Sequence, residues 1–347
     1  MIDLRSDTLT KPSKGMMEAM MKAPLGDDVF KEDPTLLELQ SKLAAMFGME
    51  AGLFFPSGVM CNQMAIKCHT NPMDEIICDE LSHIYNAENG GWAIHSGVSI
   101  KLLKGDRGRF TSEDVLNSIN PKVDWMPNTK LVCAENTVNK GGGSIWNFEE
   151  LKKIGETCSA NGLKYHLDGA RLFNALAETN QQPTDYGRIF DSISICFSKG
   201  LGCPIGSVLL GDEEFIARAR KWRKAFGGGM RQAGILAAAC IYALENNLPL
   251  IKEDHRRAKT IGAYLVNASF VKYLYPVESN IVLFEIIDSL NNDGFLQLLA
   301  EQGIRAVPFG KNTIRMVTHL DFDDAQLNQV KQGLNAINEL IREQIAE

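Results

Sequence analysis

Lys199 is the residue whose setting points most directly to chemistry. It follows residues 191–197, where isoleucine and phenylalanine alternate with serine and cysteine, a period-two pattern that predicts a buried strand. A lysine is costly to bury unless it is paired or covalently used. Ligands of open α/β sheets bind beyond the carboxyl ends of the strands. Lys199 is therefore either an ordinary surface residue just past a strand or a reactive amine at the bottom of a cleft.

Three other polar features also stand where a predicted strand ends. Ser57 and Gly58 lie between a predicted strand and a predicted helix, and the free N–H groups and dipole of a helix N-terminus favour phosphate. Asp168 and His83 each follow a further predicted strand. Each feature alone also fits an ordinary turn, a structural histidine or a surface carboxylate.

The elements that must position these residues alternate along the chain up to about residue 248. Apolar runs predict strands at residues 51–55, 75–78, 96–103, 130–134, 164–167, 191–197 and 206–210. Helical periodicity and capping residues predict helices at residues 34–47, 57–68, 111–119, 147–162, 212–225 and 233–244. Strands that alternate with helices predict an α/β fold with a mostly parallel sheet covered by helices on both faces.

The pattern changes after residue 248. From there the order is a long helix, a strand, a helix, two strands and a final helix. The long helix is expected from about residue 250 and the first strand at 280–286. The next helix is expected at 293–302, the two strands at 304–308 and 313–318, and the final helix from 323. We therefore expect an N-terminal arm at residues 1–14, a large domain at 15–248 and a smaller α+β domain at 249–347.

The four features converge if the sheet is parallel, because the carboxyl ends of its strands share one edge. A lysine can form a Schiff base with an aldehyde, and a carboxylate such as Asp168 can pair with a protonated ring nitrogen. An imidazole such as His83 can stack on a ring, and a helix N-terminus can hold a phosphate. Together these are the needs of pyridoxal 5′-phosphate.

Composition excludes several other classes of protein. The 347 residues are 45% hydrophobic and 23% charged, as in ordinary globular proteins. The net charge of −7 argues against nucleic acid as a partner. The longest apolar stretch, residues 233–244, is too short to span a bilayer, so no membrane partner is expected. Eight cysteines without a CxxC pair and six histidines without HExxH spacing predict no disulfide and no metal site, and fit a reducing cytoplasm.

A series of motifs in chain order resembles the L-threonine aldolases, which are fold type I pyridoxal phosphate enzymes. The motifs are Arg5-Ser6-Asp7-Thr8, Gly26-Asp27-Asp28-Val29, Glu32-Asp33-Pro34, Pro56-Ser57-Gly58, Ser82-His83-Ile84, Glu135-Asn136-Thr137, Asp168-Gly169-Ala170-Arg171, Ser198-Lys199-Gly200-Leu201, Gly206-Ser207 and Gly227-Gly228-Gly229-Met230-Arg231-Gln232. They run from residue 1 to about residue 320. The resemblance implies a large domain that binds the cofactor and a smaller C-terminal domain.

The resemblance also implies roles for particular residues. Lys199 would hold the cofactor as a Schiff base, Asp168 would pair with the ring nitrogen, and His83 would stack on the ring. The cofactor-binding residues that it implies are Ser57, Gly58, Val59, His83, Asp168, Arg171, Lys199 and Arg231. Ser57, Gly58 and Val59 would hold the phosphate, with Arg231 supplied by a second subunit.

The implied reaction is retro-aldol cleavage of L-threonine or L-allo-threonine to glycine and acetaldehyde. Ser6, Arg171 and Arg315 would bind the substrate carboxylate, which suits the bidentate fork of arginine. Lys199 and His83 would be the catalytic residues, with His83 as the candidate base because its ordinary pKa lies near neutral pH. The resemblance further implies a homotetramer, a dimer of dimers with active sites at the dimer interface.

The chain departs from the family pattern near the expected substrate. Val59 stands where the family usually has threonine, Cys61 where it has glycine, and Val138 where it has histidine. Asn86 and Ala87 stand where aromatic residues are frequent. These departures leave three alternatives open: β-elimination from a β-substituted amino acid, cleavage of a bulkier β-hydroxy amino acid, and a non-catalytic binding protein that retains the fold.

Overall fold

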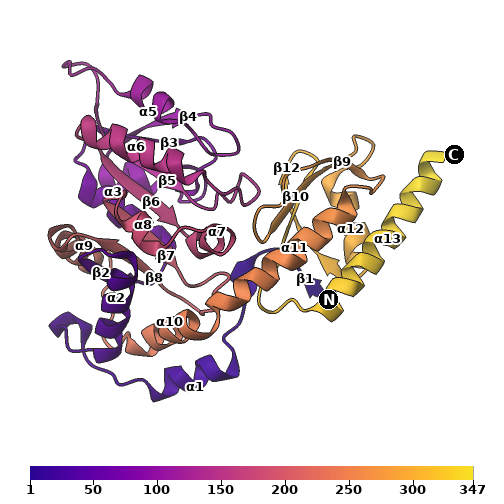
Figure 1. Ribbon diagram of the computed structural model, residues 1–347, viewed down its shortest axis with the longest axis horizontal. Helices are drawn as coiled ribbons and strands as arrows, with labels where there is room; N and C mark the ends of the chain where they lie inside the picture. Colours follow the sequence, from indigo (N-terminus) through magenta and orange to yellow (C-terminus); the bar gives the residue numbers. More distant parts are fainter. Residues whose placement is uncertain (347) are drawn as a thin grey trace.

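One seven-stranded sheet forms the centre of the larger part of the molecule in the computed structural model, which describes residues 1–346 (Figure 1). The strands are β2 (Ala51–Phe55), β3 (Asp74–Asp79), β4 (Ser99–Leu103), β5 (Asn128–Glu135), β6 (Lys164–Gly169), β7 (Ser192–Cys196) and β8 (Ser207–Gly211). Their order is β2-β8-β7-β6-β5-β3-β4. Only β8 runs against the others within this sheet, because it is antiparallel to both β2 and β7. The predicted α/β fold with a mostly parallel sheet is confirmed.

Helices cover both faces of this sheet. They are α1 (Lys14–Lys22), α2 (Pro34–Phe47), α3 (Gly58–His69), α4 (His83–Asn86), α5 (Ser112–Ser118), α6 (Phe148–Ala160), α7 (Leu172–Glu178), α8 (Pro183–Gly187), α9 (Glu213–Ala225) and α10 (Gly234–Asn246). Alternate side chains of β2 enter different cores. Leu53 and Phe55 pack with α3 and α9, whereas Phe54 packs in the main core with α2 and α10. A strand buried on both sides explains why β2 is apolar without interruption.

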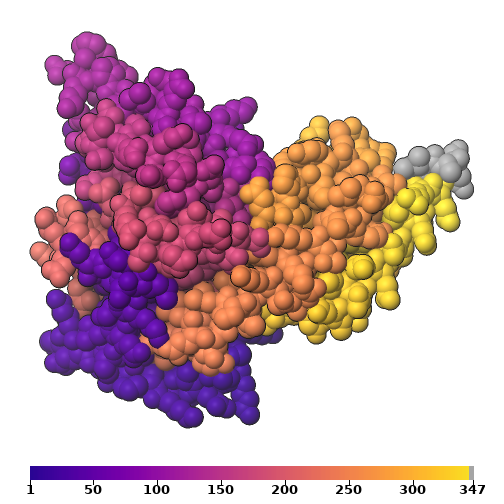
Figure 2. Space-filling view, in the orientation of Figure 1, coloured from indigo at the N-terminus to yellow at the C-terminus, as the bar shows by residue number. Residues whose placement is uncertain are grey.

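The smaller part contains a four-stranded antiparallel sheet in the order β12-β13-β10-β9. Its strands are β9 (Val271–Leu274), β10 (Ile281–Ile286), β12 (Val307–Gly310) and β13 (Thr313–Val317). Its helices are α11 (Ile251–Leu265), α12 (Asn292–Glu301) and α13 (Asp324–Ala346). The two parts lie side by side and touch in the space-filling view (Figure 2). The boundaries at residues 14 and 248 remain our proposal for the domain division.

The N-terminal arm crosses to the smaller part, as the position of β1 beside the orange and yellow elements shows (Figure 1). Strand β1 (Ile2–Asp3) pairs in parallel with β11 (Ile304–Arg305). Ile2 and Leu4 are buried in the core of the smaller part. The arm therefore starts on the smaller part and then passes the carboxyl edge of the large sheet.

No single helix among residues 1–346 has both the length and the apolar character needed to cross a membrane. One pair, Gly234–Asn246 with Leu248–Leu265, meets that requirement by length and composition but bends by 52° at the break.

Candidate active site

A cavity of about 140 Å³ lies at the carboxyl edge of the large sheet. Its lining residues are Ser57, Gly58, Val59, Asn62, His83, Asp168, Ala170, Ser194, Ile195, Cys196, Ser198, Lys199 and Ser207. The structure thus brings together the lysine, the carboxylate, the histidine and the helix N-terminus that the sequence placed at separate strand ends. The parallel direction of β2, β3, β6 and β7 is the reason.

Lys199 stands two residues after Phe197, whose N–H donates to the carbonyl of Gly206 at 3.0 Å. The carbonyl of Lys199 accepts the N–H of Gly202 at 2.8 Å and the hydroxyl of Thr10 at 2.9 Å. These bonds hold the backbone from the following turn and from the N-terminal arm. The side-chain nitrogen of Lys199 makes no ion pair or hydrogen bond with the side chains that the structure describes. The amine is therefore free to react with a ligand in the cavity.

Helix α3 begins at Gly58, and its first turn faces the cavity. The hydroxyl of Ser57 caps the helix by accepting the N–H of Met60 at 3.2 Å. The N–H groups of Gly58 and Val59 precede the first intrahelical bond and have no helical acceptor. Ser207, on the neighbouring strand β8, has a buried hydroxyl that finds no hydrogen-bond partner in the described chain. Free N–H groups and an unsatisfied hydroxyl fit a phosphate group.

Asp168 is the penultimate residue of β6 and is buried. Its Oδ2 accepts the side-chain amide of Asn62 at 2.8 Å, and its Oδ1 accepts the N–H of Ala170 at 3.1 Å. Two donors orient the carboxylate within the cavity wall. This arrangement fits a partner for a protonated ring nitrogen.

His83 is the first residue of α4 and is held at two points. Its N–H donates to Oε2 of Glu135 at 2.7 Å, and its Nδ1 lies 2.8 Å from Oε1 of Glu88. Burial opposes protonation of His83, but the bond to Glu88 and the charges of Asp168 and Glu135 outweigh it and raise the pKa of His83. Burial and the charge of Asp168 also raise the pKa of Glu135.

Arg171 follows Ala170, which lines the cavity, and two nitrogens of its guanidinium group already donate to Asp7. Its Nε donates to Oδ2 of Asp7 at 2.8 Å, and its Nη2 donates to Oδ1 at 2.7 Å. Asn280 also donates to Asp7, at 3.3 Å. Burial alone would raise the pKa of Asp7, but the guanidinium of Arg171 outweighs burial and lowers it. Nη1 makes no hydrogen bond in the described chain, so its N–H groups are the ones most open to a substrate.

Arg315, on β13, also has two of its three nitrogens bonded, but to neutral acceptors. Its Nη1 donates to Oδ1 of Asn139 at 2.8 Å and its Nη2 to the carbonyl of Arg5 at 3.0 Å. Its buried Nε has no partner in the described chain. Burial, together with the positive charge of Arg171, lowers the pKa of Arg315 to about 10. Arg315 has no ion pair with Asp7, which pairs with Arg171, so a substrate carboxylate could supply a counter-charge for Arg315.

Ser6 and Arg231 do not line the cavity of this chain. The hydroxyl of Ser6 accepts the N–H and the hydroxyl of Thr8, at 3.2 and 2.8 Å. Arg231 is exposed and pairs with Asp27 at 3.0 Å. Any contact of Arg231 with a cofactor would therefore have to be made in another subunit.

Four polar residues of the site were not predicted from the sequence: Asn62, Glu88, Ser194 and Ser207. Asn62 stands four residues after Gly58, so the period of the helix places both on one face. That spacing was the available signal for Asn62. Glu88 lies in an irregular segment after α4, where no period indicates which side chains point inward.

One group of residues in the described chain has the composition of a metal site. Ligand atoms of His83, Glu88 and Asp168 lie within 4.8 Å of one another. The amide of Asn62 donates to both carboxylates, at 2.9 Å to Glu88 and 2.8 Å to Asp168. Because N–H donors already occupy these oxygens, the group is explained by hydrogen bonding and we assign no metal to it.

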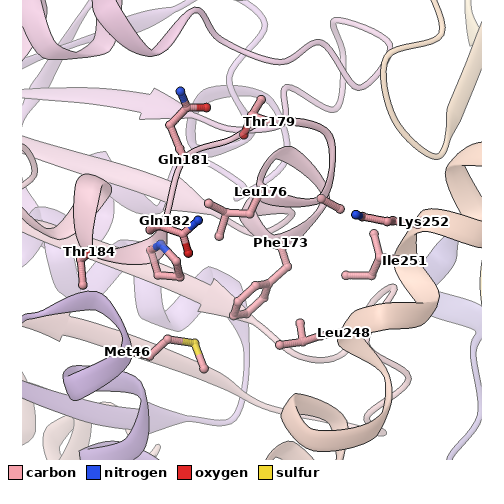
Figure 3. A pocket seen from close by; sticks show the side chains of 12 residues that line it. Met46, Phe173, Leu176, Thr179, Gln181, Gln182, Thr184, Leu248, Ile251 and Lys252 are labelled. Atoms are coloured by element: carbon pink, nitrogen blue, oxygen red, sulfur yellow. The ribbon is translucent and has the colours of Figure 1, made fainter.

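A larger cavity of about 590 Å³ lies elsewhere, between α2, α7, α8 and α11. Figure 3 shows that Phe173 and Leu176 stand at its centre, with Met46 and Lys252 at its edges. Lys252 is the single titratable side chain that lines it. Without a second acid, base or nucleophile, this cavity offers no catalytic chemistry, although it is the larger of the two.

Comparisons with known proteins agree with this geometry. A family model described as beta-eliminating lyase matches residues 3–288. The chain is 39% identical over 333 residues to the low specificity L-threonine aldolase of Escherichia coli (strain K12), covering 95% of this chain and 97% of that protein. It is 38% identical over 325 residues to low-specificity L-threonine aldolase 1 of Arabidopsis thaliana, covering 92% and 91%.

A solved structure of threonine aldolase from Leishmania major has the same fold, with a TM-score of 0.83. The alignment covers 97% of this chain and 100% of that chain at 20% sequence identity. The sequence match over almost the full length of both curated relatives settles the family. The chain belongs to the beta-eliminating lyase family and, within it, to the low-specificity L-threonine aldolases, which are fold type I pyridoxal phosphate enzymes.

Proposed function

We propose that this chain is a pyridoxal phosphate-dependent carbon–carbon lyase that cleaves L-threonine and L-allo-threonine into glycine and acetaldehyde. The observation that carries the proposal is the single cavity in which Lys199, Asp168 and His83 meet the N-terminus of α3. The sequence identity to low-specificity L-threonine aldolases supports the choice of substrate.

The residues of the cavity fit the parts of the cofactor. Lys199 would take the aldehyde carbon, Asp168 the ring nitrogen and His83 one face of the ring. Gly58 and Val59 would bind the phosphate through their free N–H groups, with the unsatisfied hydroxyl of Ser207 as a further donor and Ser57 as the cap of the helix. When bound, pyridoxal phosphate supplies an electron sink for the electron pair of the broken Cα–Cβ bond.

The arginines would hold the substrate. Arg315 offers its unpartnered Nε and Arg171 its Nη1 to the carboxylate, with Ser6 nearby in the arm. Hydrogen bonds between charged groups of this kind are the stronger ones in proteins. A fixed carboxylate restricts the rotation of the substrate about its amino nitrogen, and this decides which bond of Cα is cleaved.

His83 would take the proton of the β-hydroxyl. Its Nδ1 faces Glu88, so Nε2 is the nitrogen that can accept a proton from a substrate. Val138 is aliphatic and buried against Gly108, so the position where relatives of this type usually carry a histidine contributes no base here. Removal of the proton from the β-hydroxyl oxygen is therefore assigned to His83.

We further propose a homotetramer with active sites at a dimer interface. Met21, Phe30 and Ile94 are large apolar side chains that lie exposed in one chain, and Arg231 lies outside its own cavity. A cytoplasmic location is proposed because all eight cysteines are free, as is usual in a reducing compartment.

The test is a product assay with the purified protein and pyridoxal phosphate. Glycine and acetaldehyde should form in equal amounts from L-threonine and from L-allo-threonine. Phenylserine tests a bulkier side chain, and serine and cysteine test β-elimination through release of pyruvate. Pyruvate without glycine would contradict the proposal, as would the absence of any product from a protein that has bound the cofactor.

A further inference from the structure

The side chain of Asn62 joins the carboxylate of Asp168, which lines the cavity, to that of Glu88. Its amide donates to Oδ2 of Asp168 at 2.8 Å and to Oε1 of Glu88 at 2.9 Å. All three side chains are buried. Because each amide hydrogen serves one carboxylate, Asn62 links the two acids as one hydrogen-bonded unit.

Ser194 and His166 fix the orientation of the Asn62 amide by contacting its oxygen. Its Oδ1 accepts the hydroxyl of Ser194 at 2.7 Å, and Nε2 of His166 lies 3.3 Å away. The opposite orientation would turn Oδ1 towards two carboxylates, where it would accept nothing and be repelled. His166 must therefore carry its proton on Nε2.

Ser192 and His69 extend this series of hydrogen bonds beyond His166. Nδ1 of His166 and Nε2 of His69 both lie 2.8 Å from the hydroxyl of Ser192. Ser192 has one proton, which goes to the bare Nδ1 of His166, so His69 donates to Ser192. Burial lowers the pKa of His166 to about 4 and that of His69 well below its ordinary value. Both rings are neutral, and every donor in the series points towards the two carboxylates.

Glu88 has its own set of donors. Its Oε2 accepts the side-chain amide of Gln63 at 2.6 Å, and its Oε1 accepts Asn62 and faces Nδ1 of His83 at 2.8 Å. An ionised carboxylate only accepts hydrogen bonds. Nδ1 of His83 must therefore carry a proton, and in the neutral ring Nε2 keeps its lone pair. Nε2 has no hydrogen-bond partner among residues 1–346.

We propose that Glu88 and Asn62 are positioning residues for this reaction. Glu88 holds His83 in the tautomer protonated at Nδ1, and Asn62 ties Glu88 to Asp168, so that the base and the partner of the ring nitrogen keep one relative position. The base role of His83 rests on the proposed function. The tautomer and its hydrogen bonds do not, because they follow from contacts within the chain.

The other charges that face His83 are accounted for. They are Glu135 from β5, which binds the backbone N–H of His83, and Asp168 from β6. Lys199 lines the same cavity. Among the charged residues around His83, Glu88 is the one that hydrogen-bonds to the imidazole. A change at Glu88 therefore removes a direct contact that Glu135 and Asp168 do not make.

The test compares Glu88→Gln and Glu88→Asp with the parent protein. The readout that needs no turnover is the rate at which diethylpyrocarbonate modifies His83 in the apoprotein, followed by peptide mass spectrometry as a function of pH. Only the neutral ring reacts, so the midpoint reports the pKa of His83. Glu88→Gln should move the midpoint, and the acid limb of kcat/KM for threonine, to lower pH. Since general acid–base catalysis contributes about 10²–10⁴-fold, kcat should fall on the order of 10-fold or more with little change in KM.

Glu88→Asp separates position from charge. It keeps the negative charge but shortens the side chain, so the pKa of His83 should shift less than in Glu88→Gln while kcat still falls. Asn62→Ala should weaken binding of pyridoxal phosphate, measured by absorbance titration, because Asp168 loses its donor. The matched control is Glu75→Gln, since Glu75 is also buried and also accepts a side-chain amide, from Asn120 at 2.7 Å, outside the cavity.

An unchanged midpoint and an unchanged pH profile in Glu88→Gln would overturn the proposal, as would equal effects from Glu75→Gln. Thermal unfolding of each variant shows whether it is folded. If the parent protein cleaves no amino acid but the midpoint shifts as expected, the proposed function fails and the assignment of the tautomer stands.

Discussion

Asp7 connects the N-terminal arm to the catalytic edge of the sheet. It is fully buried and accepts hydrogen bonds from Arg171 and Asn280, residues of the larger and the smaller part. The charge of Lys199 also lowers the pKa of Asp7. The carboxylate of Asp7 thus connects the arm to Arg171 in the larger part and to Asn280 in the smaller part.

Asp7→Asn should be strongly destabilising. It leaves Arg171 buried without its counter-charge, which costs about 3–5 kcal/mol for a buried pair. The free energy of unfolding in urea measures this. Asp3→Asn is the control, because Asp3 pairs with Arg5 in the same arm but is partly exposed, and such pairs contribute about 0–1 kcal/mol. Equal losses in the two variants would contradict the account.

Arg315→Lys should weaken substrate binding. Lysine cannot reproduce the planar set of donors, and charged hydrogen bonds are worth about 1.5–3 kcal/mol, so KM for threonine should rise on the order of 10-fold or more. Steady-state kinetics measures it, with the exposed Arg256→Lys as control. An unchanged KM would exclude a role in carboxylate binding.

Some of the side chains that line the cavity could be predicted from the sequence because their types are unusual at strand ends. Lys199 and Asp168 are of this kind. The occupied fork of Arg171 could not be predicted, since its partner Asp7 lies 164 residues away in the chain. Glu88 was missed because no local pattern shows that a glutamate in an irregular segment turns inward.

Helix α3 shows how one element serves both stability and binding. Ser57 caps it at 3.2 Å from the N–H of Met60 and also lines the cavity. The same serine therefore stabilises the helix and keeps its N-terminus directed at the expected phosphate.

Ser57→Ala should have two separable effects. Loss of the cap costs about 1 kcal/mol of unfolding free energy, and loss of the hydroxyl should weaken binding of pyridoxal phosphate. Asn147→Ala is the matched control, because Asn147 caps α6 at 2.9 Å from the N–H of Glu149, away from the cavity. It should lose similar stability without change in cofactor affinity. Equal affinities in both variants would show that Ser57 does not serve the phosphate.

Elements with clear end signals were predicted best. The predicted bounds of α2 and β2 agree with the structure, since Asp33 caps α2, Pro34 begins it and Gly48 ends it in the left-handed conformation. Helix α1 and strand β9 were not predicted. β9 has no fully buried residue, so it lacks the apolar alternation that marks a strand. The strand predicted at 304–308 proved to be two strands that pair with different partners.

The molecule as a whole is held together by pairings between distant segments. The parallel pairing of β1 with β11 joins the start of the N-terminal arm to the smaller part, with Ile2 opposite Ile304. A two-residue strand carries no periodic signal, so the sequence indicated an arm but not the sheet that it joins. The division into a large and a small domain could be predicted, because the alternation of strands and helices ends near residue 248.

Asp254 should make stability depend on pH. It lies in α11, its Oδ1 is buried without a hydrogen bond in the described chain, and Arg257 stands 3.8 Å away. Burial raises its pKa from the ordinary 3.8 to about 7. Between these two pKa values the folded state binds a proton that the unfolded state has lost. The contribution of Asp254 to stability is therefore complete below about pH 4 and is lost as pH rises towards 7, by at most about 4 kcal/mol.

Asp254→Asn should remove this dependence. Its melting temperature should exceed that of the parent protein at pH 8 and match it at pH 4, and calorimetry across that range measures both. Asp124→Asn, at an exposed position, should follow the parent curve. If the stability of the parent protein and that of Asp254→Asn changed by the same amount between pH 4 and pH 8, the assignment would be contradicted.

The central claim is that Lys199 bonds to pyridoxal phosphate at the carboxyl edge of the sheet. Borohydride reduces the C=N bond between this cofactor and a lysine, and peptide mass spectrometry then identifies the modified residue. We expect modification of Lys199 in the parent protein, and loss of modification, cofactor absorbance and threonine cleavage together in Lys199→Ala. Modification of a different lysine, or a Lys199→Ala variant that keeps its cofactor absorbance and cleaves threonine, would contradict it.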